Sequence, residues 1–177
     1  YIKRTPLADF RSQRRGGKGL AGMQTKEEDV VTNLFVANTH TQLLFFSTDG
    51  MAYKLKTWRL PQGGRTSKGK AIVNILPIPT GVSVAAILPI DRDEADWSEL
   101  QIVFATSAGT VRRNALSDFT NVKSNGKIAM KFEDDHADTT LINAKIASPE
   151  DDVMLVTASG RAIRFPSEDV RVFNSRS

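Results

Sequence analysis

The sequence contains no cysteine, few aromatic residues (7%) and only two histidines. Without cysteine, neither a disulfide framework nor a cysteine-ligated zinc site can form, which fits a reducing compartment. His40 and His136 lie 96 residues apart, and neither has a partner at the spacing of metal ligands. No apolar run approaches the roughly 20 residues of a membrane-spanning helix, and no signal peptide is recognisable. We therefore expect a cytoplasmic protein without a membrane anchor, metal centre or disulfide.

Signatures of covalent chemistry are also missing. The sequence has no Gly-x-Ser-x-Gly elbow, and the glycines from Gly16 to Gly19 lack the spacing of a phosphate-binding loop. His136 follows an acidic run that is typical of a solvated turn. We therefore expect no catalytic residue and no cofactor in this chain. Long stretches of helical periodicity are absent too, and this favours an all-β fold.

One hairpin motif occurs three times. Phe46–Gly50, Ala105–Gly109 and Val156–Gly160 each end in small polar residues and a glycine, and each motif ends an apolar run of strand length. Glycine adopts positive φ readily, as the tight turn of a hairpin requires. We therefore expect a strand on each side of every motif. Further expected elements are strands at Leu34–Ala37, Val84–Leu88 and Leu141–Ile146, and an acidic surface loop at Asp91–Glu99.

The repeat is regular enough to be numbered. The hairpin glycines Gly50, Gly109 and Gly160 are 59 and 51 residues apart, a period typical of propeller blades. We count repeat positions forward from each hairpin glycine, which is position zero. In the first repeat the position is the residue number itself. Position four then holds Arg4, Lys54, Arg113 and Arg164. We predict one domain with blades at about 1–50, 51–109 and 110–160 and a fourth starting at 161–177. Both ends look cut from something larger, which leaves an incomplete arc of about three and a half four-stranded blades.

The aromatic residues follow the same repeat. Trp58 and Trp97 are expected to be packing or loop anchors. Most phenylalanines recur with the predicted strands, and we expect them to form the blade cores. These are Phe10, Phe45, Phe104, Phe119, Phe132 and Phe165.

Charge is sorted by repeat position. The net charge of +4 comes from 24 basic and 20 acidic residues. The first twenty residues of each repeat, as far as the chain goes, hold 20 of the basic residues and only 4 of the acidic ones. Equivalent parts of successive blades lie side by side in a propeller, so this sorting predicts a basic rim. A band of positive potential is the electrostatic signature of a nucleic-acid binder.

The most basic loop, Gln13–Gly19, holds three cations and three glycines in seven residues. Its letters are those of the glycine-arginine box that distinguishes gyrase among type IIA topoisomerases. The flanking Tyr1–Thr5, Leu34–His40, Ile72–Asn74 and Gly109–Val111 are similar as well. Over its whole length the chain resembles the C-terminal domain of the bacterial DNA gyrase A subunit.

The resemblance implies a propeller-like β-pinwheel of about six blades, in which neighbouring blades exchange strands. It implies that duplex DNA wraps around the basic outer edge and is presented to the cleavage core as a positive crossover, as a step in ATP-dependent negative supercoiling. It also implies that the protein is located at the nucleoid. The implied partners are the N-terminal cleavage part of the gyrase A subunit and the gyrase B subunit, which assemble into a heterotetramer. The DNA-cleaving tyrosine and the sites for ATP and Mg²⁺ are implied to lie outside this chain.

The DNA-binding residues predicted from the repeat and the resemblance are basic residues of successive blades, together with the box itself. On the first blade they are Arg4, Gln13, Arg14, Arg15, Gly16, Gly17, Lys18 and Gly19. On the second they are Lys54, Lys56, Arg65, Lys68 and Lys70. On the third and fourth they are Arg112, Arg113, Lys123, Lys127, Arg161 and Arg164.

Two alternatives remain open at this point. The first is the corresponding domain of the topoisomerase IV A subunit, which has similar blades but a degraded or absent box. The second is a protein-binding β-propeller scaffold, which would carry aromatic or mixed-charge patches on the blade tops. The intact box and the sorted cations favour the gyrase domain over both.

Overall fold

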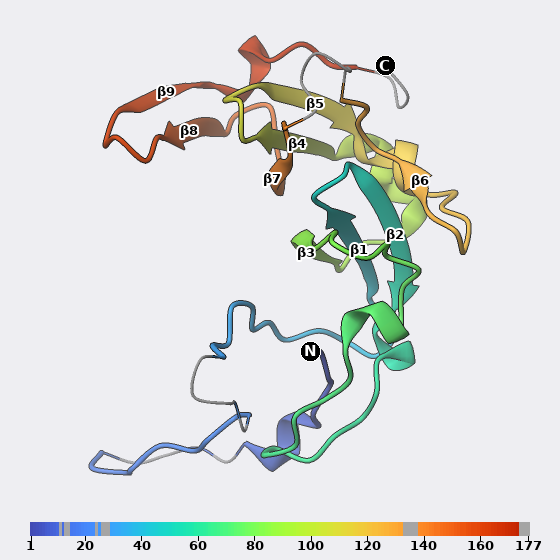
Figure 1. Cartoon of the computed structure of the whole chain (residues 1–177), viewed down its shortest axis with the longest axis vertical. Coiled ribbons are helices and arrows are strands. Elements are labelled where there is room, and N and C mark those ends of the chain that lie inside the picture. The colour runs from blue at the N-terminus through green and yellow to red at the C-terminus, as the bar shows by residue number, and fades with distance from the viewer. Residues whose placement is uncertain (11, 13–14, 24, 26–28, 133–137, 174–177) are drawn as a thin grey trace.

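The computed structural model describes residues 1–10, 12, 15–23, 25, 29–132 and 138–173, in which short strands and 3-10 helices follow one another along an arc (Figure 1). The strands of this part are β1 (Gln42–Ser47), β2 (Met51–Lys56), β3 (Val84–Ile90), β4 (Gln101–Thr106), β5 (Val111–Ala115), β6 (Lys127–Ile128), β7 (Leu141–Ala147), β8 (Asp152–Val156) and β9 (Ala162–Pro166). The 3-10 helices are η1 (Leu7–Asp9), η2 (Thr57–Arg59), η3 (Ile72–Asn74), η4 (Glu94–Glu99), η5 (Leu116–Phe119) and η7 (Ser167–Asp169). The all-β prediction is confirmed.

The three predicted hairpins are the framework of the fold. β1 pairs antiparallel with β2, β4 with β5, and β8 with β9. Each turn closes at a glycine with positive φ, namely Gly50, Gly109 and Gly160. Apolar runs supply the side chains that a half-buried pleated surface favours, and the glycine supplies the turn. The strands on both sides of each motif are therefore confirmed.

The first two hairpins are extended in the same way. β3 adds to β1, and β7 adds to β4, so the orders β3-β1-β2 and β7-β4-β5 are equivalent. In both the β1–β3 and the β4–β7 pairing, the register shifts at the same repeat positions, −4 and −3. These are Phe46/Ser47 in β1 and Ala105/Thr106 in β4. A recurring bulge at equivalent positions indicates one structural unit used twice. Among the described residues, the third sheet consists of β8 and β9.

The outer strand of the first sheet comes from the next repeat. β6 follows the hairpin β4–β5 along the chain, but it pairs antiparallel with β2, through Met51 with Ile128 and Ala52 with Lys127. At the first junction the antiparallel bridge between Ile2 and Lys70 corresponds to this pairing. Parallel bridges also join Arg4 to Gln62 and Arg113 to Val172. Consecutive blades are therefore joined by backbone hydrogen bonds as well as by packing.

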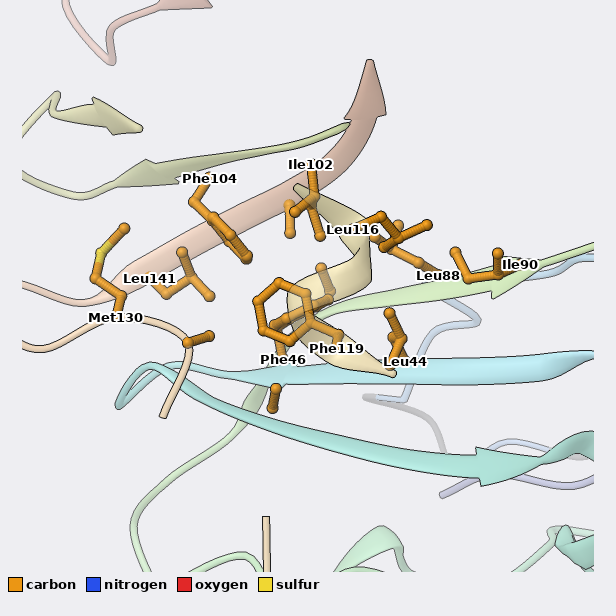
Figure 2. Close-up of a cluster of buried hydrophobic side chains, with 14 of the residues drawn as sticks. Leu44, Phe46, Leu88, Ile90, Ile102, Phe104, Leu116, Phe119, Met130 and Leu141 are labelled. Atoms are coloured by element: carbon orange, nitrogen blue, oxygen red, sulfur yellow. The ribbon is translucent and has the colours of Figure 1, made fainter. Parts of the chain in front are cut away.

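The hydrophobic cores lie between consecutive blades. The larger one joins the first and second sheets, and most of its residues come from β1, β3, β4, η5 and β7 (Figure 2). Within it, the rings of Phe46, Phe104 and Phe119 meet edge to face, with centroids 5.1–5.9 Å apart. A second core places Leu43 and Phe45, on the opposite face of β1, against Leu76 and other residues that follow β2 in the chain. The first sheet thus buries both of its faces.

Three sequence expectations are corrected here. Leu34–Ala37 is not a strand, and Leu34 is 89% exposed. The equivalent strands β3 and β7 each pair with the first strand of a hairpin, and no such strand lies beside residues 34–37 among the described residues. Asp91–Glu99 is more than a surface loop, because it contains η4, whose Trp97 is fully buried in the larger core. Phe10 is exposed rather than part of a core.

Candidate nucleic-acid interface

Three basic turns occupy equivalent places in successive repeats: residues 15–19, 63–70 and 123–127. Two of them follow the 3-10 helix at the end of a hairpin, η2 or η5, and the first follows η1. Each contains at least one glycine with positive φ, including Gly16, Gly69 and Gly126. The third lies on the convex side of the arc, just before β6 (Figure 1). These three turns are the candidate nucleic-acid interface.

Most of the basic side chains in these turns face solvent. Arg15, Lys18, Lys70 and Lys123 are exposed, and Gly17 and Gly19 leave the backbone of the first turn open. Three further cations of the turns are half-buried: Arg65, Lys68 and Lys127. Gln13 and Arg14 of the predicted box lie outside the described residues. A lysine or arginine with a solvated head group can neutralise a phosphate without first giving up an internal partner.

The second turn is held against the start of the chain. Lys3 Nζ donates to the carbonyl oxygens of Gly64 and Arg65 at 2.8 and 2.6 Å. Burial lowers the pKa of Lys3. A Cβ on Gly69 would lie 2.7 Å from the carbonyl oxygen of Ile2, so only glycine lets the two backbones approach this closely. Lys68 Nζ lies 4.1 Å from the ring centroid of Tyr1, within the range of a cation–π contact.

The third turn is held against the first sheet. A Cβ on Gly126 would lie 2.8 Å from the ring of Tyr53 in β2. Lys127 Nζ donates to the carbonyl oxygen of Asp118 in η5. Lys123, by contrast, is exposed at the start of the turn. The scaffold therefore fixes one end of this turn and leaves the other open to solvent.

Three cations that the sequence assigned to the DNA track point into the protein. The side chain of Lys54 is 14% exposed and its Nζ lies 2.7 Å from Glu94 Oε1. Arg113 is 7% exposed and donates from Nη2 to the carbonyl oxygen of Glu168 at 3.3 Å. Arg112 is 8% exposed. In this arrangement the three are not on the exposed track that the sequence predicts, because the next blade covers them.

Arg112 belongs to a buried polar network. Its Nε donates to Asn114 Oδ1 at 3.1 Å, and its guanidinium carbon lies 5.1 Å from the ring centroid of Phe173. Asn114 in turn donates to the carbonyl oxygen of Phe173 at 2.7 Å and to Asp118 Oδ2 at 3.2 Å. Burial lowers the pKa of Arg112, and the negative charge of Asp118 opposes that shift. This network joins β5 to the segment after η7.

The remaining predicted cations divide between solvent and internal partners. Lys56 and Arg161 are exposed. Arg4 is half-buried, and its Nε donates to the carbonyl oxygen of Leu60 at 3.0 Å. The side chain of Arg164 is 74% exposed and forms an ion pair with Asp152 on its own hairpin. The sequence analysis did not single out Lys3, which contacts the second turn. Its repeat position, three, is also that of Arg112, and this shared position was the available signal.

Comparison with known proteins identifies the family of this fold. The family model described as the DNA gyrase C-terminal domain, a β-propeller, matches residues 1–38, 41–91, 101–140 and 151–177. The chain belongs to the DNA gyrase C-terminal domain family. The matched ranges of the gyrase domain omit residues 92–100, which include η4 and its buried Trp97.

Relatives of this gyrase domain extend over its whole length. The chain is 43% identical over 177 residues to the DNA gyrase A subunit of Rickettsia bellii (strain RML369-C), covering 100% of this chain. It is 47% identical to that of Granulibacter bethesdensis, covering 99% of this chain, and 39% identical to that of Escherichia coli (strain K12), covering 97%. In all three cases the chain spans 19% of the relative's length.

Solved structures share the fold of this gyrase domain. The C-terminal domain of DNA topoisomerase IV superposes with a TM-score of 0.79 at 21% identity, covering 99% of this chain and 51% of the other. The DNA gyrase A C-terminal domain superposes with a TM-score of 0.71 at 22% identity, covering 99% of this chain and 54% of the other. These identities are low, so the likeness shows the fold alone. The family model and the 39–47% identical gyrase sequences assign the chain to gyrase, against the topoisomerase IV alternative.

Proposed function

We propose that this chain binds and bends duplex DNA as the wrapping domain of a DNA gyrase. The observation that carries the proposal is the recurrence of solvent-facing basic turns at equivalent positions in consecutive blades. Consecutive turns can contact phosphates along a curved path, and no single strong site is required. The contacts fix the path of the duplex but read no base sequence, since phosphates carry no sequence information directly.

The energetics of bending suit many weak contacts. Bending 20–30 base pairs by 40–90° costs on the order of 1–6 kcal/mol. Each cation that neutralises a phosphate releases counterions, so affinity falls steeply with salt, with a log–log slope of about −0.9 per phosphate. Arg15 and Lys18 of the first turn, with Arg14 and Gln13 beside them in sequence, anchor one end of the wrap. Arg65, Lys68, Lys70, Lys123 and Lys127 continue it, and Lys56 and Arg161 are further exposed cations of these repeats.

In the whole enzyme the bent duplex is handed to other parts. The partners are the cleavage part of the gyrase A subunit and the gyrase B subunit, acting in the bacterial cytoplasm. Wrapping presents a second DNA segment as a positive crossover, which ATP-dependent strand passage converts into negative supercoils. ATP and Mg²⁺ are bound outside this chain, and the wrapping domain supplies no catalytic residue.

A salt titration of DNA binding tests the interface. The variant Lys70→Ala/Lys123→Ala removes one exposed cation from each of two turns. Its matched control, Lys131→Ala/Lys145→Ala, removes two exposed lysines outside the turns. We expect the turn variant to flatten the slope of log Kd against log salt by about 0.9 for each phosphate that is no longer neutralised, and the control to leave it unchanged. Equal slopes for both variants would move the DNA path away from the turns.

A topology assay separates wrapping from mere binding. A nicked circular duplex is sealed with the chain bound, and the change in linking number is measured after the protein is removed. We expect a change that grows with bound protein and is reduced in the turn variant. Binding without any linking change would leave a DNA-binding module that does not wrap. Absence of DNA binding at low salt would favour the protein-binding scaffold instead.

A further inference from the structure

The basic residues at repeat position four share a different set of contacts from those in the turns. Each of the first three donates to a backbone carbonyl of the following repeat. Arg4 Nε reaches the carbonyl oxygen of Leu60 at 3.0 Å, and Arg113 Nη2 reaches that of Glu168 at 3.3 Å. Lys54 Nζ donates to the carbonyl oxygen of Thr120. The repeat position of the basic residue is constant, and the acceptor always lies on the next blade.

The acceptors also share a structural setting. Leu60 and Thr120 are the C-terminal cap residues of η2 and η5, and Glu168 lies within η7. Carbonyls in the last turn of a helix have no partner within that helix, and cations are favoured near this end. Arg113 and Lys54 are largely removed from solvent, so their hydrogen bonds are only weakly screened. A buried charge without a hydrogen-bond partner would cost free energy, so the side chain is held toward its carbonyl acceptor.

The fourth member of the series provides an internal comparison. Arg164 occupies the same repeat position on β9, yet its side chain is 74% exposed and pairs with Asp152 of the neighbouring strand β8. Its partner is therefore on its own hairpin. The inward course of Lys54 and Arg113 therefore does not follow from the strand position alone.

We propose that Arg4, Lys54 and Arg113 are positioning residues, here called clamp residues, that fix each blade to the 3-10 helix of the next. The basic turns begin shortly after the clamped carbonyls: Leu60 precedes the second turn by three residues, and Thr120 precedes Lys123 by three. The clamp residues therefore set where each turn stands relative to the preceding blade. That the clamp residues influence the curvature of bound DNA rests on the proposed function. That they dock one blade on the next does not.

Thermal unfolding of the whole 177-residue chain tests the docking. Arg113→Gln removes a clamp charge, and Arg164→Gln removes the charge at the same repeat position where the side chain pairs with Asp152 of its own hairpin. We expect Arg113→Gln to lower Tm by roughly 4–12 °C and Arg164→Gln to lower it by less than about 2 °C. Lys54→Met provides a second clamp variant, which keeps an unbranched apolar stem and removes the charged nitrogen. Conservative replacements, Lys54→Arg and Arg113→Lys, are expected to retain at least half of the stabilisation.

The salt dependence of DNA binding distinguishes a clamp from a phosphate contact. We expect Lys54→Met to leave the slope of log Kd against log salt unchanged, while Lys123→Ala flattens it by about 0.9. Two results would overturn the proposal: equal Tm for Arg113→Gln and Arg164→Gln, or a flattened slope for Lys54→Met at unchanged Tm. If the wild-type chain binds no DNA but the Tm difference is observed, the clamp stands and the proposed function fails.

Discussion

Replacing Gly50 by alanine measures how tightly the first hairpin is docked against the next repeat. Gly50 has a φ of +83°, and a Cβ there would lie 2.3 Å from the carbonyl oxygen of Met130. The carbonyl oxygen of Gly50 also accepts hydrogen bonds from the backbone of Ala129 and Met130, at 2.9 and 3.1 Å. The substitution therefore adds strain within the turn and pushes the two segments apart.

The equivalent glycine of the second hairpin is a matched control. Gly109 has nearly the same φ, +82°, but a Cβ there would meet nothing within 4 Å. The left-handed conformation costs an L-residue roughly 1–2 kcal/mol at either site. Overpacking against a fixed backbone adds typically about 1–3 kcal/mol at Gly50 alone. We therefore expect Gly109→Ala to lower the free energy of unfolding by about 1–2 kcal/mol and Gly50→Ala by about 2–5 kcal/mol.

Urea denaturation followed by tryptophan fluorescence gives both values. Trp97 is fully buried in the core that both hairpins share, whereas Trp58 is exposed. A Trp58→Phe background therefore restricts the signal to the interface between the blades. Equal losses of stability for the two alanine variants would refute the close approach of Gly50 to Met130.

Two further predictions concern the cores. Phe104→Ala removes a fully buried ring that contacts Phe46 and Phe119, and it should lower the free energy of unfolding by about 3–5 kcal/mol. Met154→Ala, at an exposed position of β8, should change that free energy by less than about 0.5 kcal/mol. Similar urea midpoints for the two variants would contradict the buried core. Burial and the charge of Asp49 raise the pKa of Tyr53 against the opposing hydrogen bond of Ser47. Because the unfolded tyrosine then ionises first, at about pH 10, the contribution of Tyr53 to stability is present below that pH and is lost above it. The urea midpoint should fall less between about pH 9 and pH 11 in Tyr53→Phe than in wild type.

Local signals were sufficient to predict the hairpins. In Phe46–Gly50 and its two counterparts, an apolar run, small polar residues and a glycine specify both the strands and the turn within about ten residues. The burial of Phe104 and Phe119 also followed from their recurrence with the strands, although the core they form lies between two blades.

Strand exchange needed the rest of the molecule. β6 has only two residues, Lys127 and Ile128, and its partner Ala52 lies 75 residues earlier in the chain. No periodicity can be recognised in so short a strand, and its pairing is decided by the docking of one blade on another. Residues 34–37 show the converse, because this apolar segment forms no strand where the described residues place no partner strand beside it.

The direction of each basic side chain was equally hidden. Lys54 and Lys56 alternate with apolar residues in β2, so the sequence places both on one exposed face. In the structure Lys56 is exposed, but Glu94 of η4 and the carbonyl oxygen of Thr120 draw Lys54 inward. Both partners come from the following repeat or from the acidic segment before it. Sequence position sorts the cations by repeat, but only the contacts with neighbouring blades decide which of them remain exposed.

The late arrival of β6 has a consequence for biosynthesis. The first sheet cannot acquire its fourth strand until residue 128 has left the ribosome, several seconds after β2 at about 5–20 residues per second. During that interval the edge of β2 offers unpaired amides and carbonyls to any passing strand. The first sheet is thus completed only after the following repeat has been synthesised.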